Sequence, residues 1–165
     1  MATLRTRLVA ATAIGVASAF TTTATITTAN ASDVTEYVVT ADFDDVRQDL
    51  SDAVINRGYK IDYEAYIGEM LARTSQDVGG KKEIYKKAEL VQFCSAVLSR
   101  KAMEAGPANI AFCPYVLFVY ERSDEEGKIR VGFRRLDEQG SDASKQALAA
   151  VNALLDEIVL EAADQ

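Results

Sequence analysis

The fold is decided by the stretch Ile110-Ala111-Phe112-Cys113-Pro114-Tyr115-Val116-Leu117-Phe118-Val119-Tyr120, which is apolar at nearly every position. Such a run predicts a central β-strand buried on both faces, with Pro114 at an edge or a bulge because proline has no N–H for the ladder. A polar turn is expected at residues 123–127, and apolar residues then alternate with polar ones over residues 129–134. Together these segments predict a hairpin between a central strand and a half-exposed partner.

Upstream of the hairpin, two strands are expected to alternate with two helices. The first strand has four apolar residues on one face: Tyr37, Val39, Ala41 and Phe43. Asp44 and Asp45 offer an N-cap for the helix that follows, and this helix is expected to end at Gly58. A second strand is expected over residues 59–65 and a second helix over residues 67–75. Three residues of the second helix are expected to face inward: Ile67, Met70 and Leu71.

The rest of the chain continues this alternation. Five segments are expected in chain order: a loop over residues 77–82, a helical turn over 84–88, a short strand over 90–94, a helix that Ser95 caps and Gly106-Pro107 stops, and an amphipathic helix over 141–163. The last helix has one apolar side, formed by Leu148, Val151, Leu155 and Ile158. The prediction is therefore an α+β (α/β-like) fold in which a single layer of about five strands has helices packed against it and ends in a C-terminal amphipathic helix.

The first residues have the pattern of an export signal. A short positive start precedes an uncharged, alanine-rich stretch over residues 8–20, and Ala29-Asn30-Ala31 matches a small-x-small cleavage site. We therefore expect cleavage between Ala31 and Ser32. An uncleaved membrane anchor is the alternative, but the apolar stretch is shorter than the ~20 residues that cross a bilayer. These features predict a periplasmic protein with no membrane span after the signal peptide is removed.

The domain that follows the signal peptide is acidic. Removal of residues 1–31 leaves one domain, residues 32–165, in which 16 lysines and arginines face 25 aspartates and glutamates, a net charge of −9. Nucleic acids and anionic membranes attract proteins with clustered positive charge. The composition therefore argues against both as partners, and it predicts a single domain large enough to bury a core.

Several chemistries are excluded by composition. The chain has no histidine, which removes the Ser-His-Asp triad, the Cys-His pair and haem attachment. Two cysteines cannot form a four-thiolate zinc site, and the sequence Gly79-Gly80-Lys81-Lys82 matches neither a phosphate-binding nor a dinucleotide-binding spacing. We therefore expect no catalytic residue, no bound cofactor and no metal site, and a function that is more plausibly non-enzymatic.

The charged runs have simple structural interpretations. Asp44-Asp45 is expected to cap a helix and Asp124-Glu125-Glu126 to form a hairpin tip. Four lysines form a basic cluster in the sequence: Lys81, Lys82, Lys86 and Lys87. A solvated face is the first interpretation of this cluster, and a site for an anion or an acidic partner is the alternative.

Several segments resemble the DUF302 family, a domain of unknown function. They are Phe43 to Ile61 with its Arg57-Gly58-Tyr59 sequence, Ile67-Gly68-Glu69-Met70-Leu71, Gln92-Phe93-Cys94, Pro107 to Tyr115, and Val119-Tyr120-Glu121. The second and third are similar to exported, cysteine-bearing members of the family. The resemblance implies the fold and the compartment but carries no known activity. It also implies that Tyr85 and Tyr115 lie nearest to the cysteines.

The two cysteines, Cys94 and Cys113, admit four interpretations. Export favours a structural disulfide, which would close a loop of about 20 residues and contribute about 3 kcal/mol. Two unpaired thiols buried as small hydrophobic groups are the second, and a redox or sulfur-handling thiol near a helix N-terminus is the third. The fourth is a Cu(I) site completed by Met70 or Met103. A crossover that brings the two strands together as a parallel pair could hold the cysteines too far apart for a bridge.

The sequence thus supports two functional hypotheses. The first is a periplasmic, non-enzymatic binding or interaction domain for an unknown small molecule or protein, with self-association into a homodimer through a sheet edge or the last helix. The second is thiol-based redox or sulfur-handling chemistry at Cys94 and Cys113.

Overall fold

The hairpin predicted from the apolar stretch lies at the centre of the sheet. Strand β4 (Tyr115–Arg122) and strand β5 (Lys128–Arg134) pair antiparallel in the computed structural model, which describes residues 33–164. The turn between them closes at Gly127, whose φ of 76° is a conformation that glycine adopts without strain. The backbone N–H of Gly127 donates a 2.8 Å hydrogen bond to the buried carboxylate of Glu121, which fixes the turn to β4.

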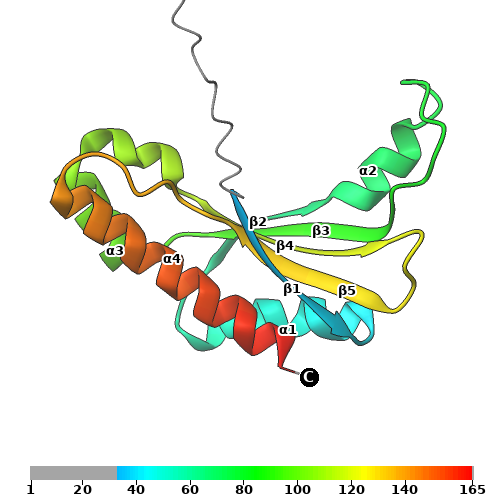
Figure 1. Cartoon of the computed structure of the whole chain (residues 1–165), viewed down its shortest axis with the longest axis horizontal. Helices are drawn as coiled ribbons and strands as arrows, with labels where there is room; N and C mark the ends of the chain where they lie inside the picture. The colour runs from blue at the N-terminus through cyan, green and yellow to red at the C-terminus, as the bar shows by residue number, and fades with distance from the viewer. Residues whose placement is uncertain (1–32, 165) are drawn as a thin grey trace, which may run out of the picture. The chain divides into compact units, whose positions relative to one another are not determined.

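Five strands form one antiparallel sheet in the order β1-β5-β4-β3-β2 (Figure 1). The other three strands are β1 (Val34–Thr40), β2 (Ile61–Tyr66) and β3 (Tyr85–Phe93). The helices are α1 (Phe43–Asn56), α2 (Ile67–Thr74), α3 (Ala96–Ala105), the 3-10 helix η1 (Pro107–Phe112) and α4 (Asp142–Ala163). The predicted α+β fold, with a five-stranded layer and a C-terminal helix, is confirmed.

The hydrophobic core lies between the sheet and helices α1 and α4. The four residues predicted to form the apolar side of α4 are all fully buried: Leu148, Val151, Leu155 and Ile158. They pack with alternate residues of the hairpin, among them Leu117, Val119, Val131 and Phe133, which are also fully buried. Burial of each such side chain contributes about 1.5–3 kcal/mol, so this layer stabilises the domain.

The opposite face of the sheet, called the open face below, is less covered. Burial alternates along β4, so that Val116, Phe118 and Tyr120 on the open face are half-buried between the buried residues of the core face. The prediction of a strand buried on both faces is therefore wrong. The physical reason is the pairing: antiparallel sheets can pack helices on one face alone, and α1 and α4 lie on the same side of this sheet (Figure 1).

The predicted strand at residues 110–120 is two different elements. Residues 107–112 form η1, Cys113 and Pro114 join it to the sheet through a cis peptide bond, and β4 begins at Tyr115. The side chain of Asn109 in η1 donates a 2.7 Å hydrogen bond to the carbonyl of Ala102 in α3. This contact holds η1 against α3. The pattern of apolar residues in the sequence does not reveal such a contact, so it did not indicate that residues 107–112 form a separate element.

Strand β3 also differs from its prediction. It begins at Tyr85, so the helical turn expected over residues 84–88 is wrong and the strand is longer than residues 90–94. Lys87 and Glu89 interrupt the apolar pattern because both face α1. Lys87 donates a 2.7 Å hydrogen bond to Asp44, and Glu89 accepts one of 3.0 Å from Arg47. Because α1 supplies their charged partners, Lys87 and Glu89 occupy inward positions where an alternating strand pattern would have apolar residues.

The helix boundaries follow their capping residues. Asp42, rather than Asp44 or Asp45, caps α1, and its carboxylate accepts a 2.8 Å hydrogen bond from the N–H of Asp44. Phe43 is consequently the first residue of α1 and not the last of a strand. Ser95 caps α3 as predicted, accepting a 3.3 Å hydrogen bond from the N–H of Leu98. Among residues 33–164, no helix is long and apolar enough to span a membrane.

Candidate functional site

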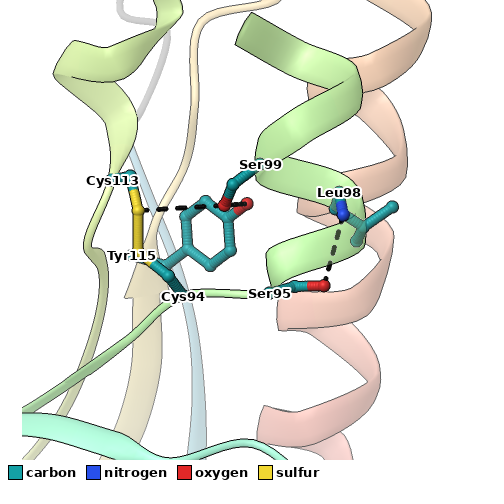
Figure 2. The surroundings of a disulfide bond; sticks show 6 residues. All are labelled: Cys94, Ser95, Leu98, Ser99, Cys113 and Tyr115. Carbon is teal, nitrogen blue, oxygen red and sulfur yellow. Dashed lines mark hydrogen bonds between the residues drawn. A yellow bond between two sulfur atoms is a disulfide. The ribbon is translucent and has the colours of Figure 1, made fainter.

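The two cysteines meet at one end of the sheet. Phe93, the last residue of β3, lies opposite Tyr115, the first residue of β4, in an antiparallel pair. Cys94 directly follows Phe93 and Cys113 precedes Tyr115 by two residues, so both leave the sheet at the same end. Their Cα atoms are 6.1 Å apart and the structure joins them in a disulfide (Figure 2). The parallel arrangement that could have separated them is wrong.

The disulfide is surrounded by hydrogen-bonded side chains from α3 and β4. The hydroxyl of Ser99 lies 2.8 Å from the hydroxyl of Tyr115 and 3.8 Å from the Sγ of Cys113, and Figure 2 shows it between these two groups. Ser99 and Tyr115 are buried. Burial raises the pKa of the Tyr115 phenol further above physiological pH. These contacts place the bridge against α3 and the start of β4.

The two tyrosines expected near the cysteines lie at opposite ends of the sheet. Tyr115 is beside the disulfide, as the contacts above show. Tyr85 is the first residue of β3 and lies opposite Arg122, at the far end of the β3–β4 pair. The structure therefore brings one of the two tyrosines to the cysteines and not the other.

The interpretations that require unpaired sulfur atoms, which are the two buried thiols and the Cu(I) site, do not fit the bridged pair. Within residues 33–164 both sulfur atoms are joined, and no group of three or more His, Cys, Asp or Glu side chains is placed to hold a metal ion. A Cu(I) site would also need a nearby methionine. Met70 lies on α2, and its helix approaches β3 near the far end of that strand, where Gly68 lies beside Ala88. Met103 of α3 does line the same small space as Cys113, but the bridge leaves no thiolate there to bind Cu(I).

A hollow of about 320 Å³ lies on the open face of the sheet, beside the start of α2. Its walls come from β1, β3, β4 and α2, and its lining side chains are mostly aliphatic or aromatic: Val34, Ile67, Tyr85, Leu90, Phe118 and Tyr120. Glu36 adds a carboxylate at one side. This combination of a concave apolar surface and few polar groups is the usual character of a small-molecule site.

Two glycines shape the hollow by close approach. A Cβ atom on Gly132 of β5 would lie 2.5 Å from the ring of Phe118 and 2.3 Å from the carbonyl oxygen of Thr35. Because Gly132 has no side chain, the Phe118 ring lies across β5 on the open face. A Cβ atom on Gly68 would lie 2.9 Å from the backbone nitrogen of Ala88, so this glycine lets α2 approach β3.

A polar cluster closes the hollow on the β1 side. The phenol of Tyr120 donates a 2.9 Å hydrogen bond to Glu36, and burial, then this hydrogen bond, raises the pKa of Tyr120 to about 12. The guanidinium of Arg130 lies 5.8 Å from the centre of the Tyr120 ring and donates a hydrogen bond to Glu125. The Nη1 atom of Arg130 is buried and has no hydrogen-bond partner among the described residues.

The predicted basic cluster is dispersed by ion pairs. Lys82 pairs with Asp124 and Lys86 with Glu126, both at the hairpin tip, at 3.6 and 2.6 Å. Lys87 pairs with Asp44 on the other face of the sheet. The acidic hairpin tip thus neutralises much of the cluster, which supports the interpretation as a solvated face.

The comparisons with known proteins agree with this architecture. A single antiparallel sheet with helices α1 and α4 on one face and a bridged cysteine pair at one end defines an α+β domain. The chain belongs to the family described as "Domain of unknown function DUF302", whose model matches residues 35–162. The suggested family membership is therefore confirmed.

A solved structure of the same family supports the fold. The chain is similar to the crystal structure of an uncharacterized conserved protein DUF302 from Bacillus stearothermophilus, with a TM-score of 0.65 and 15% sequence identity. The match covers 80% of this chain and 99% of that one. No curated protein matches the sequence. At this identity the comparison establishes the fold, and the site must be judged from its own side chains.

Sequence reasoning missed the hollow. Its floor combines Phe118 and Tyr120 of β4 with Ala88 and Leu90 of β3, residues that lie side by side in the antiparallel register. The alternation of burial along β4 was not visible in the sequence, because residues 115–120 are apolar on both faces of the strand. Because the first half of β3 was predicted as a helical turn, its open-face residues were not recognised as neighbours of β4.

Proposed function

We propose that the protein is an exported, non-enzymatic binding protein whose ligand site is the hollow on the open face. The observation that carries the proposal is the apolar and aromatic lining of this hollow on a sheet face that α1 and α4 leave uncovered. The absence of histidine and of nucleotide-binding glycine patterns from the sequence favours binding over catalysis.

Export is part of the same proposal. The expected signal peptide, residues 1–31, lies outside the residues that the structure describes, so its assignment rests on the sequence alone. The Cys94–Cys113 disulfide is in keeping with an oxidising compartment such as the periplasm, because disulfides are rare in the reducing cytosol.

A fluorescence titration tests the binding role. N-phenyl-1-naphthylamine, a neutral probe that brightens in apolar surroundings, should bind the wild-type protein at one saturable site. Leu90→Asn places an amide in the hollow and should weaken binding about tenfold, as the loss of a buried apolar contact predicts. Ile110→Asn is the matched control, because Ile110 is 63% exposed on η1, and it should bind as the wild type does. Equal binding by both variants would place the probe elsewhere.

Thiol–disulfide exchange is the second candidate function. Its supporting observation is that Cys94 directly precedes Ser95, the N-cap of α3, so a thiolate at Cys94 would be stabilised by the helix N-terminus. A dithiol protein would donate two electrons and two protons, which break the Sγ–Sγ bond, and would itself become a disulfide. Incubation of the native protein in millimolar reduced glutathione, followed by thiol titration, distinguishes the two roles. An exchange role predicts two titratable thiols and a structural bridge predicts none.

Self-association through a sheet edge is the proposed assembly. The apolar side of α4 is buried in the core, which leaves the edge strands β1 and β2. The sequence of β1, Val34–Thr40, has one charged residue, Glu36, and Val38 is 53% exposed. Edge strands with few charges readily pair with another chain. Light scattering after size exclusion should show a dimer, and Val38→Lys should convert it to a monomer.

A further inference from the structure

We propose that the hollow on the open face takes a small organic cation, an ammonium or quaternary ammonium group on an apolar body. This inference rests on the proposed function and adds the chemical class of the ligand. The ligand must be small, because the volume of about 320 Å³ lies near the lower end of the range for small-molecule pockets.

The aromatic walls favour a cation. The rings of Tyr85 and Tyr120 meet edge to face with centroids 5.3 Å apart, and the rings of Phe118 and Tyr120 lie 5.9 Å apart. Aromatic ring faces carry partial negative charge, and several rings around one site attract an ammonium group. The guanidinium of Arg130 already lies 5.8 Å from the centre of the Tyr120 ring, so the rings that remain for a ligand cation are those of Tyr85 and Phe118.

The carboxylate of Glu36 supplies the charge that selects the ligand. Glu89 also lines the hollow, but its carboxylate is bound to Arg47 on the opposite face of the sheet. Glu36 accepts the hydrogen bond from Tyr120, which holds its carboxylate beside the aromatic wall. The structure therefore places one acidic group next to the rings, the arrangement that recognises an amine with an apolar body.

The neighbouring charges are balanced around this carboxylate. Arg130 is hydrogen-bonded to Glu125, and its Nε forms a longer ion pair of 3.9 Å with Glu36. Glu125 is also ion-paired with Arg122, and both Lys82 and Arg122 are paired with Asp124. The preference for a cation therefore rests on the aromatic rings, on the Glu36 carboxylate at the wall, and on a chain of net charge −7, which repels an anion.

Three probes that share one apolar body test the inference by calorimetry at neutral pH. They are 3-phenylpropylamine, 3-phenylpropan-1-ol and 3-phenylpropanoate, which share a phenyl ring on a three-carbon chain and carry a positive, a neutral and a negative head group. The amine should bind about tenfold more tightly than the alcohol, as a cation–π contact and one carboxylate predict, and the carboxylate probe should bind most weakly. Equal affinity of the amine and the alcohol would overturn the inference.

Variants assign the preference to Glu36. Glu36→Gln keeps an oxygen for the Tyr120 hydrogen bond and should reduce the preference for the amine to below about threefold, with the affinity of the alcohol unchanged. Glu104→Gln is the control, because Glu104 is an exposed, ion-paired residue of α3. It should leave all three affinities unchanged. A preference that persists in Glu36→Gln would overturn the role of this carboxylate.

Salt provides a measurement that does not depend on a variant's folding. Raising the ionic strength from about 20 to about 300 mM should weaken binding of the amine but not of the alcohol, because screening acts on charge alone. The two proposals also fail differently. Suppose that the alcohol binds the wild type, that Leu90→Asn abolishes this binding, and that the amine has the same affinity as the alcohol. The binding role then stands and the cation preference is wrong. If none of the three probes binds, both proposals are wrong.

Discussion

Tyr120 and Glu36 are 84 residues apart in the chain, and the phenol of Tyr120 donates a 2.9 Å hydrogen bond to the Glu36 carboxylate on the open face of the sheet. Tyr120 lies opposite Arg130 and Glu36 lies opposite Gly132, so the bond crosses β5 between β4 and β1. Gly132 presents no side chain on that face. This contact ties the edge strand β1 to the aromatic wall of the hollow.

The Tyr120 contact predicts a loss of stability at high pH. Burial and the hydrogen bond to Glu36 raise the pKa of Tyr120 to about 12, whereas an unperturbed tyrosine has a pKa of about 10. Between these values the unfolded chain loses the phenol proton and the folded chain retains it. The stabilisation is therefore complete below pH about 10 and disappears as the pH rises through about 12.

Tyrosinate absorbance and urea unfolding across this range measure the effect. The pKa values of Tyr37 and Tyr115 are also raised, so Tyr120→Phe is needed to assign the last ionisation. Tyr120→Phe should remove that ionisation and flatten the decline in stability. Glu36→Gln should lower the pKa of Tyr120, since the carboxylate charge no longer opposes ionisation. If Tyr120→Phe leaves the titration unchanged, the phenol is not held as the structure shows.

A methyl group at position 132 should displace the Phe118 ring and destabilise the sheet. The Cβ of Gly132→Ala would lie 2.3 Å from the carbonyl oxygen of Thr35 and 2.5 Å from the Phe118 ring, so both β1 and the ring must move. We expect a loss of about 1–3 kcal/mol, the usual cost of overpacking. Gly79→Ala is a reference for backbone strain alone, because its Cβ would meet no atom within 4 Å and its φ of 71° is unfavourable for alanine, whereas Gly132 does not have a positive φ. Thermal melts of both variants check the prediction.

The sequence predicts well those elements whose signals are local. The hairpin has alternating residues and a turn at Gly127, and α3 has a serine cap at Ser95. α4 has a continuous apolar side, and its predicted bounds differ from the structure by one residue. Each of these signals lies within the element that it defines, so no tertiary contact is needed to recognise it.

The errors lie where distant partners determine the structure. Lys87 and Glu89 occupy inward positions of β3 because Asp44 and Arg47 of α1 neutralise them. The hollow depends on Gly132 of β5 lying beside Phe118 of β4, a register that the sequence does not specify. The disulfide also depends on a distant relationship, because it forms where β3 and β4 lie antiparallel. The sequence was interpreted with these two strands as a parallel pair.

Adjacent residues of β4 should respond very differently to a buried charge. Leu117 is fully buried on the core face, and Leu117→Asp should cost several kcal/mol, on the order of the ~5–15 kcal/mol that stabilises a whole domain. Val116 is half-buried on the open face, where a carboxylate keeps contact with water. Val116→Asp should therefore remain folded with a modest loss. Circular dichroism melts of the two variants test the assignment of faces, and unfolding of both would mean that β4 is covered on both sides.

Export predicts a defined N-terminus. If the signal peptide is cleaved at its small-x-small site, protein recovered from the periplasm should begin at Ser32-Asp33. Ala31→Asp, which places a charge at the cleavage position, should leave the precursor uncut and membrane-associated. N-terminal sequencing and the mass of the exported protein measure both results. A mature protein that still begins at Met1 would contradict the prediction.

The Cys94–Cys113 disulfide should stabilise the domain by constraining the unfolded chain. The bridge joins residues 19 apart in the sequence. Closing a loop of this length contributes about 3 kcal/mol in the chain-entropy model. Cys94→Ser and Cys113→Ser should each lose this amount, and the double variant should lose little more, because the same bond is absent in all three. Dithiothreitol should lower the melting temperature of the wild type to that of the variants and leave theirs unchanged. The mass of the native protein should be two hydrogens below that of the reduced form. Roughly additive losses that do not respond to reductant would instead indicate two independent thiols.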